Sequence, residues 1–133
     1  ALAATGMTGA QVVHDSVDLS AVGHLGRDVI IGAGSVMSVG TRIADHVHVN
    51  VGVTLSHDVL VGEYATLSPG VHVAGWVDIR PRAFIGTGAS IINGSPGERL
   101  VIGEDAVVAA GACVLGSVEP ASLYAGVPAR RKR

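Results

Sequence analysis

The stretch from residue 43 to residue 73 contains the pattern that governs this chain; it reads Ile43-Ala-Asp-His-Val-His-Val49-Asn-Val-Gly-Val-Thr-Leu55-Ser-His-Asp-Val-Leu-Val61-Gly-Glu-Tyr-Ala-Thr-Leu67-Ser-Pro-Gly-Val-His-Val73. Every sixth residue in it is aliphatic. The same spacing extends in both directions, from Val13 to Ile91, and each of these key positions is aliphatic or Met. The sequence therefore predicts a repeat protein with a hexapeptide period.

A second series, mostly of small or β-branched residues, lies two positions before the key positions. Its members are Val17, Gly23, Val29, Ser35, Thr41, Val47, Val53, Val59, Ala65, Val71, Val77, Ala83 and Ala89. Residues i−2 and i lie on the same face of a β-strand. Strand alternation does not restart every six residues unless the chain turns a corner each time. Small residues directly after key positions, such as Gly32, Ser38 and Gly62, mark these corners.

Three short strands and three corners make a coil of about 18 residues. The pattern therefore predicts an all-β fold: a left-handed parallel β-helix, shaped as a triangular prism of about five to six coils. A thin interior filled layer by layer accommodates Val, Ile, Leu and Ala better than rings. The composition agrees, because Tyr64, Trp76, Phe84 and Tyr124 are the chain's only aromatic residues.

The repeat suggests how the 133 residues are divided. Register holds to Ile92, breaks in a Gly-, Ser- and Pro-containing segment, and resumes at Ile102. This break predicts a loop insertion of about five residues, at about 93–100. We expect a lead-in or linker stub at 1–12, the β-helix at 13–118, and a C-terminal cap with a basic tail at 119–133.

Composition excludes several classes of protein. The single cysteine, Cys113, permits neither an internal disulfide framework nor a Cys-rich metal site, so a reducing compartment is expected. No long apolar run or signal-like start is present, and we expect a cytoplasmic protein with no membrane partner. The formal net charge is −2, with four basic residues at 130–133, so the remaining body is acidic and unsuited to nucleic acid. The basic tail is either a solvated end or a phosphate contact.

His57 and Asp58 are the first candidates for chemistry. The corner position turns His57 outward, and an imidazole beside a carboxylate suits a general base with an orienting partner. A solvated surface pair is the alternative. Gly75 and Asn93 follow His57 at intervals of one coil, so all three should stack along one edge, from which the inserted loop also leaves.

Gly75 and Asn50 are further candidates. A glycine one coil from His57 allows close approach of a ligand, and its N–H suits a developing oxyanion. Alternatively, Gly75 serves a corner that needs positive φ. Asn50 replaces the usual small residue after a key position, and its amide is expected to bond either its own corner or a ligand.

At this point the sequence resembles a known family. The run from Asn50 to Gly75, with its spaced Asn, His-Asp, Pro-Gly and Gly, resembles the core of the bacterial sugar O- and N-acetyltransferases with hexapeptide repeats. This family includes sialic acid O-acetyltransferases and N-acetyltransferases of nucleotide-linked amino sugars. The resemblance spans nearly the whole chain, from Val13 to Ala129, and corresponds to the family's C-terminal β-helix.

The resemblance implies a homotrimer with acetyl-CoA in grooves between prisms and active sites built from two subunits. It implies transfer of acetyl to an amine or hydroxyl of a sugar or nucleotide sugar. His57 matches the catalytic base, and Asp58 the acid that orients it. Gly75 matches the glycine whose amide meets the thioester carbonyl, and Asn50 the asparagine near the acetyl group. The implied cofactor contacts are Ala74, Ala109, Ala110, Gly111, Val127, Pro128, Ala129 and Arg130.

Three features depart from the family pattern. A second active-site histidine is common nine residues after the first, where this chain has Thr66. The insertion near Asn93 is not a standard part of the pattern. Relatives usually carry an N-terminal domain that binds the nucleotide sugar, and this sequence begins about where that domain would end.

Other functions stay open at this stage. One is a non-catalytic trimeric β-helix scaffold, and another is an O-acetyltransferase that acts on serine or a simple sugar. A third is a zinc-dependent hydratase on the same fold, which needs three ligands at each interface. His46 and His48 are the one closely spaced histidine pair, and they equally suit an exposed strand, so we expect no metal.

Overall fold

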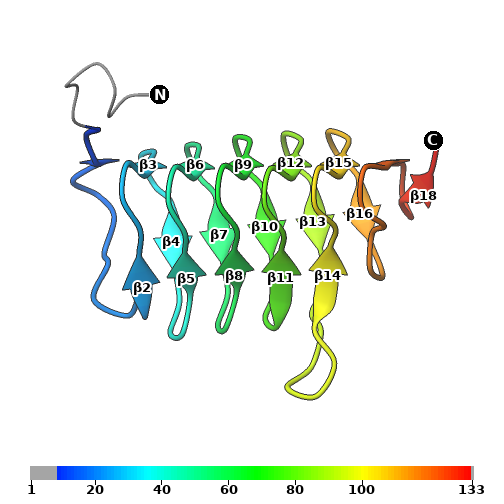
Figure 1. Cartoon of the computed structure of the whole chain (residues 1–133), viewed down its shortest axis with the longest axis horizontal. Helices are drawn as coiled ribbons and strands as arrows, with labels where there is room; N and C mark the ends of the chain where they lie inside the picture. Colours follow the sequence, from blue (N-terminus) through cyan, green and yellow to red (C-terminus); the bar gives the residue numbers. More distant parts are fainter. Residues whose placement is uncertain (1–8, 133) are drawn as a thin grey trace.

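The chain forms a prism of stacked coils, seen side-on in Figure 1. The computed structural model describes residues 9–132. Strands and turns alternate through these residues, and no helix occurs among them. The described residues therefore contain no helix that could span a membrane. The predicted all-β, left-handed parallel β-helix is confirmed.

The strands form three sheets, one for each face of the prism. The first sheet has eight strands: β1 (Val12–Val13), β3 (Ile30–Ile31), β6 (His48–Val49), β9 (Thr66–Leu67), β12 (Phe84–Ile85), β15 (Val107–Val108), β17 (Leu123–Ala125) and β18 (Arg130–Arg131). The second has five: β4 (Val36–Met37), β7 (Thr54–Leu55), β10 (His72–Val73), β13 (Ser90–Ile91) and β16 (Cys113–Val114). The third has β2 (His24–Leu25), β5 (Arg42–Ile43), β8 (Leu60–Val61), β11 (Val77–Ile79) and β14 (Leu100–Ile102).

The register follows the predicted coil length. Thr54 of β7 pairs with His72 of β10, and both strands are parallel. On the third sheet, Val77 pairs with Leu100 rather than with the residue one standard coil ahead. The difference of about five residues is the predicted insertion, which protrudes between β13 and β14 in Figure 1.

The interior is the predicted apolar column. From Ile31 to Ile91 the key positions are at most 5% exposed, and the second series is buried from Val29 onward. Two hydroxyls in that column have backbone partners: Ser35 Oγ donates to the Asn50 carbonyl at 2.8 Å, and Thr41 Oγ1 to the Ser56 carbonyl at 3.2 Å. Each buried Val, Leu or Ile side chain is worth about 1.5–3 kcal/mol before chain entropy is subtracted.

The two ends differ. At the N-terminal end, β1 pairs with β3, and the expected lead-in at 1–12 lies largely outside the described residues. The first coil is less regular, because Leu19 lies outside any strand and Gly23 is exposed. At the C-terminal end, β18 turns back antiparallel against β17, with Tyr124 opposite Arg131. This hairpin occupies the edge of the first sheet that the last coil would otherwise leave unpaired.

The turns stack into three edges, and each has its own chemistry. The turns between the first and second sheets form the glycine edge, with Gly34, Gly52, Gly70, Gly88 and Gly111 at positive φ. The turns between the second and third sheets form the His57 edge, with Gly40, Asp58 and Trp76 at positive φ. The turns between the third and first sheets form the charged edge, with Asp28, His46, Tyr64, Arg82 and Asp105 at positive φ.

Candidate active site

His57 and Asp58 form a hydrogen-bonded pair on the turn between β7 and β8. His57 Nδ1 lies 3.1 Å from Asp58 Oδ2, and the two side chains are 47% and 35% exposed. An ionised carboxylate only accepts, so the ring nitrogen that faces it must hold the proton. The arrangement leaves Nε2 as the ring nitrogen with a lone pair for a substrate proton.

Gly75 lies directly under the imidazole. A Cβ added to Gly75 would stand 2.5 Å from His57 Cε1 and 2.6 Å from Nε2. Gly75 is not among the residues with positive φ, so backbone conformation does not explain the glycine. The ring itself excludes any side chain at this position. Among the backbone hydrogen bonds of the described residues, none has the Gly75 N–H as donor, so this group is free for a ligand.

The inserted loop is anchored on the coil that contains Gly75. The Gly94 N–H donates to the Gly75 carbonyl at 3.0 Å, and the Leu100 N–H to the Trp76 carbonyl at 3.1 Å. Between these anchors, Ser95 and Glu98 exchange two backbone hydrogen bonds in a tight turn. With Trp76 N–H donating to the His57 carbonyl at 3.2 Å, the predicted order of His57, Gly75 and the loop along one edge is confirmed.

Two residues of this cluster were not predicted. The Trp76 ring meets the His57 ring edge-on, with centroids 6.0 Å apart. The Arg99 guanidinium lies 5.2 Å from the Trp76 centroid, and its Nη1 donates to the Asp58 carbonyl at 2.6 Å. The sequence predicted that the loop leaves from this edge. It did not predict the direction of the Arg99 side chain, because the hexapeptide repeat is interrupted at this residue.

Asn50 and the segment 109–111 lie on a different edge. They belong to the glycine edge, at the opposite end of β7 from His57. Asn50 Nδ2 donates to the Leu67 carbonyl at 3.1 Å, so its amide bonds the next coil. Gly111 N–H likewise donates to the Thr87 carbonyl at 2.8 Å. Apart from Gly75, Ala74 is the one expected acetyl or cofactor contact that shares the edge with His57. Within a single chain, Asn50 therefore does not lie beside the imidazole.

The C-terminal residues follow the last coil. Val127 is 75% exposed, whereas Ala129 is buried and its N–H donates to the Cys113 carbonyl at 2.7 Å. Arg131 forms an ion pair with Glu119. Arg130 Nη1 bonds only the carbonyl of Ala129 at 3.1 Å, and no carboxylate of the described residues pairs with it. Arg130 is therefore the freer of these two cations.

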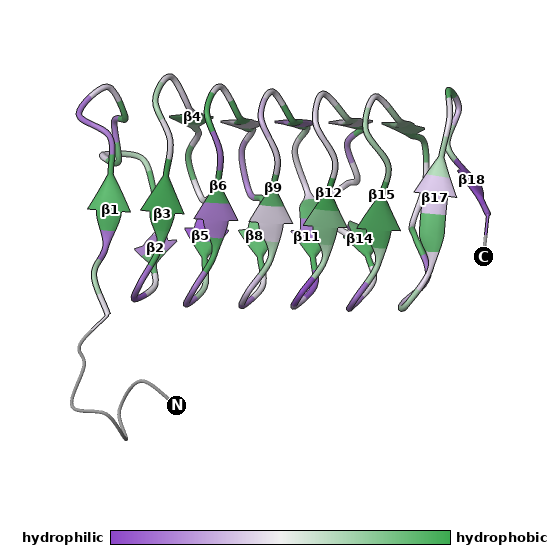
Figure 2. Ribbon diagram, turned by 90° about the horizontal axis from the view of Figure 1, so that it is seen from above, coloured by the Kyte–Doolittle hydropathy of each residue, from purple (hydrophilic) through white to green (hydrophobic). Residues whose placement is uncertain are grey.

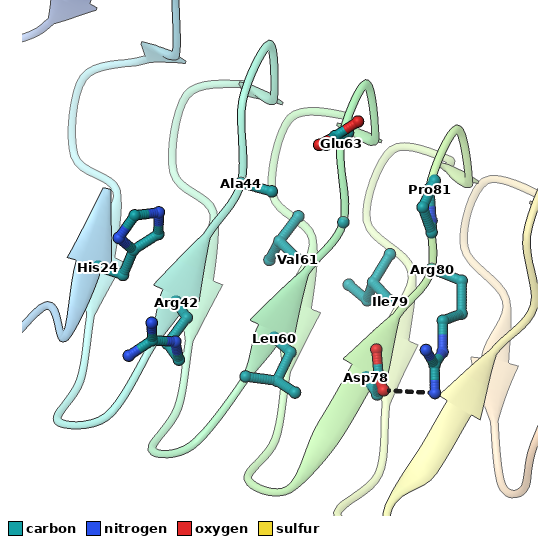
Figure 3. A pocket seen from close by; sticks show the side chains of 11 residues that line it. His24, Arg42, Ala44, Leu60, Val61, Glu63, Asp78, Ile79, Arg80 and Pro81 are labelled. Carbon is teal, nitrogen blue, oxygen red and sulfur yellow. Dashed lines mark ion pairs between the residues drawn. The ribbon is translucent and has the colours of Figure 1, made fainter. Parts of the chain in front are cut away.

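A separate shallow pocket of about 460 Å³ lies on the third sheet. Its lining includes His24, Arg42, Leu60 and the ion pair of Asp78 with Arg80, whose Oδ2 and Nη2 are 2.9 Å apart (Figure 3). None of its lining residues is among the expected site residues. The pocket and the His57 cluster are thus distinct features of the prism.

Ion pairs and hydrogen bonds join the charged side chains of successive turns along the charged edge. Asp45 accepts hydrogen bonds from the backbone N–H and the guanidinium of Arg27, and these lower the pKa of its carboxyl. Asp105 accepts from Arg82 Nε at 2.8 Å, which lowers the Asp105 pKa and raises that of Arg82. His46 lies 3.5 Å from Asp28 and stacks on Tyr64. In the described residues, no group of three or more His, Cys, Asp or Glu side chains is placed to hold a metal ion.

Solved structures share this architecture, although no family model and no curated protein matches the sequence. WeeI from Acinetobacter baumannii is 30% identical over 98% of this chain, with a TM-score of 0.92. PerB from Caulobacter crescentus, solved with CoA and GDP-perosamine, is 32% identical over 98% of this chain, with a TM-score of 0.88. The acetyltransferase domain of PglB from Neisseria gonorrhoeae, solved with acetyl coenzyme A, is 29% identical over 97% of this chain, with a TM-score of 0.84.

This chain has the β-helix of the hexapeptide-repeat sugar acetyltransferases. The resemblance of the Asn50–Gly75 run to that family is confirmed. The chain spans 61% of the WeeI and PerB chains and 60% of the PglB domain.

Within this β-helix, Thr66 occupies the position where a second histidine is common in the family that the sequence resembles. It lies in β9 of the first sheet, between His48 and Phe84. The first sheet runs from the charged edge to the glycine edge, so it faces away from the His57 edge. A side chain at position 66 therefore acts on a different part of the surface from His57 of the same chain.

Proposed function

We propose that this protein is an acetyl-CoA-dependent acetyltransferase. It transfers the acetyl group to an amine or hydroxyl of a nucleotide-linked sugar. The observation that carries the proposal is the His57–Asp58 pair with Gly75 beneath the ring. The likeness to PerB, a structure with CoA and GDP-perosamine, supports both the cofactor and the acceptor class. The lone Cys113 supports a cytoplasmic site of action.

The geometry supports direct transfer. The acceptor nitrogen or oxygen attacks the thioester carbonyl carbon while its proton passes to His57 Nε2, and Asp58 stabilises the imidazolium through Nδ1–H. The free Gly75 N–H donates to the oxyanion of the tetrahedral intermediate. Collapse breaks the carbon–sulfur bond, and the CoA thiolate takes the proton from Nε2. The imidazole is thereby returned to its starting state.

The division of candidates between two edges supports a site shared by two subunits. His57 and Gly75 lie on one edge, whereas Asn50 and Gly111 lie on the next. A second prism placed beside the second sheet brings its glycine edge to the first prism's His57 edge. A homotrimer, as the family resemblance implies, repeats this contact around a threefold axis.

Exposed apolar residues support the same packing. Val36, Val39, Val51, Ile92 and Leu115 lie on the second sheet or its two edges and are 40–63% exposed. The first sheet adds Ile30 and Phe84 to this apolar surface. In Figure 2 its strands β1, β3 and β15 are green, whereas β6 is purple. No strand of the third sheet contributes to the exposed large apolar residues found in the described part of the chain. We therefore propose that the third sheet faces solvent in the trimer.

The glycine edge fits an extended cofactor. Acetyl-CoA supplies the activated acetyl thioester, and its pantetheine needs a narrow, smooth surface. A Cβ added at Gly88 or Gly111 would meet nothing within 4 Å in this chain, so these positions leave the edge open. We propose that Ala74 and the segment 109–111 line the pantetheine, with Val127, Pro128 and Ala129 nearby. Arg130 is proposed to meet a CoA phosphate.

Calorimetric titration with acetyl-CoA tests the proposal. We expect saturable binding near one equivalent per subunit, followed by acetylation of GDP-perosamine as a probe amine, with maltose and serine as competing acceptors. Absence of acetyl-CoA binding would contradict the enzyme and favour a scaffold. Transfer to serine or maltose, but not to the nucleotide sugar, would contradict the acceptor class and leave the acetyltransferase in place.

A further inference from the structure

The inserted loop delivers one cation to the back of the His57–Asp58 pair. We propose that Arg99 is a positioning residue, which holds the Asp58 peptide and thereby keeps the carboxylate on His57 Nδ1. This inference rests on the proposed function, because it assigns a role in the same site. Arg99 itself contacts neither ring nitrogen of His57.

The contacts of Arg99 are directed at backbone carbonyls. Its Nη1 lies 2.6 Å from the backbone carbonyl oxygen of Asp58 and 3.5 Å from that of Val77. Its guanidinium lies over the Trp76 ring, and the residue as a whole is partly buried. By contrast, Arg27, Arg80, Arg82 and Arg131 each pair with a carboxylate, whereas Arg99 pairs with none in residues 9–132. A planar, rigid fork of donors suits such a backbone clamp.

Asp58 is a residue that benefits from a clamp. Its φ is 57°, in the left-handed region that is unfavourable for a residue with a side chain. Its N–H is fixed on one side by the Val39 carbonyl at 2.9 Å. The Arg99 contact fixes the following peptide through the Asp58 carbonyl. With both flanking peptides held, the direction of the Asp58 Cα–Cβ bond is set, and the His57 Nδ1–H lies within reach of the carboxylate.

The contacts close into a ring. The His57 carbonyl accepts from the Trp76 N–H, the Trp76 ring stacks on Arg99, and Arg99 donates to the Asp58 carbonyl. The Asp58 carboxylate completes the ring at His57 Nδ1. Removal of the Arg99 guanidinium therefore breaks the hydrogen bond that joins the end of the inserted loop to the Asp58 peptide. The expected result is a carboxylate that leaves Nδ1 part of the time.

Two independent measurements test this role. In the first, kcat and KM for acetyl-CoA are measured with GDP-perosamine as the probe acceptor, for Arg99→Gln, Arg99→Lys and Asp58→Asn, and for Arg99→Gln combined with Asp58→Asn. In the second, long-range proton–nitrogen NMR of histidine-labelled protein without acetyl-CoA gives the tautomer of His57. Glu98→Gln is the matched control, because Glu98 joins the loop through backbone contacts.

We expect Arg99→Gln to lower kcat by about 10- to 100-fold with an unchanged KM for acetyl-CoA, the scale of a misplaced catalytic group. Arg99→Lys should recover part of the loss, and Asp58→Asn should absorb most of the Arg99→Gln effect. The NMR spectrum of Arg99→Gln should show a smaller fraction of the Nδ1–H tautomer, and Glu98→Gln should match the wild type.

Wild-type kcat and an unchanged His57 spectrum in Arg99→Gln would overturn the inference. So would an equal fall in kcat with and without the Asp58 carboxylate, because Arg99 would then act on the substrate. If the wild type acetylates nothing, the proposed function fails, and the NMR measurement still confirms or overturns the clamp. If Arg99→Gln does not fold, Arg99→Lys gives the same comparison, with a partial loss of kcat and tautomer expected.

Discussion

The imidazole of His57 rests on the backbone of Gly75, one coil further along the chain. The distance from a hypothetical Gly75 Cβ to His57 Cε1 is 2.5 Å, which is closer than real Cβ atoms approach their neighbours. The glycine and the histidine are therefore a matched pair: the ring can occupy its position because residue 75 has no side chain. This relationship makes the smallest possible substitution informative.

Gly75→Ala should displace the His57 ring and leave the fold intact. The atoms that a new methyl group meets belong to a side chain that can rotate, and the backbone of Gly75 does not need positive φ. We expect a stability change within about 1 kcal/mol. Turnover should fall by roughly 10²-fold, because the base is moved by about 1 Å or more. Steady-state kinetics and thermal unfolding measure the two effects.

The matched control is Gly97→Ala in the inserted loop. A Cβ at Gly97 meets nothing within 4 Å, and this variant should keep wild-type turnover. Unaltered turnover in Gly75→Ala would show that the His57 position in this structure is not the active one.

His57→Ala removes the proposed base. We expect turnover to fall by about 10²- to 10⁴-fold, the usual contribution of general-base catalysis, with acetyl-CoA affinity and the assembly unchanged. Kinetics, calorimetry and sedimentation measure these three properties. His24→Ala is the control, since His24 is exposed on the third sheet, away from the His57 edge. Full turnover in His57→Ala, in protein that still binds acetyl-CoA, contradicts the mechanism.

The sequence predicted the fold well because one physical rule repeats. A thin prism accepts aliphatic residues at fixed intervals, so residues such as Ile43 and Leu67 reveal their burial by position alone. The stacking of His57 and Gly75 follows from the same arithmetic. The repeat predicted that His57 and Gly75 share an edge. It did not predict that the imidazole occupies the space in which a side chain of residue 75 would lie.

Other contacts were beyond prediction because they depend on features outside the repeat. Arg99 belongs to an interrupted segment, where no periodicity fixes the direction of a side chain. Arg131 bonds Glu119 only because β18 folds back on β17, and nothing in the sequence required that hairpin. Asn50 was predicted to bond either its own corner or a ligand, and the structure shows a bond to the Leu67 carbonyl of the next coil.

Arg130→Gln should weaken binding of CoA selectively. Arg130 has no carboxylate partner in residues 9–132 and is proposed to meet a CoA phosphate. If that phosphate is the 3′-phosphate, the variant should lose roughly tenfold in affinity for acetyl-CoA, about the worth of one charge-assisted hydrogen bond. Its affinity for the 3′-dephospho analogue should match the wild type. Calorimetry with both ligands measures the difference.

A point variant is preferable here to truncation before Arg130. Truncation deletes β18 and uncovers the edge of β17, so a loss of binding would not distinguish a missing charge from a damaged end. An equal loss for both ligands in Arg130→Gln would exclude the 3′-phosphate as the partner.

Arg82→Gln should reduce stability at neutral pH and have no effect in strong acid. Arg82 donates two hydrogen bonds to Asp105, and these lower the pKa of that carboxyl below its ordinary 3.8. A lowered carboxyl pKa stabilises the fold above pH 3.8, and the contribution is lost as the pH falls through the folded-state value. The effect is small, because both side chains are about half exposed. The thermal midpoints of the wild type and Arg82→Gln, measured between pH 2 and 7, should therefore differ at neutral pH and converge in acid. Arg42→Gln is the control, because it breaks no ion pair among residues 9–132. The difference between its midpoint and that of the wild type should not change with pH in this way. A gap between wild type and Arg82→Gln that stays constant across this range would rule out ionisation of Asp105 as its source.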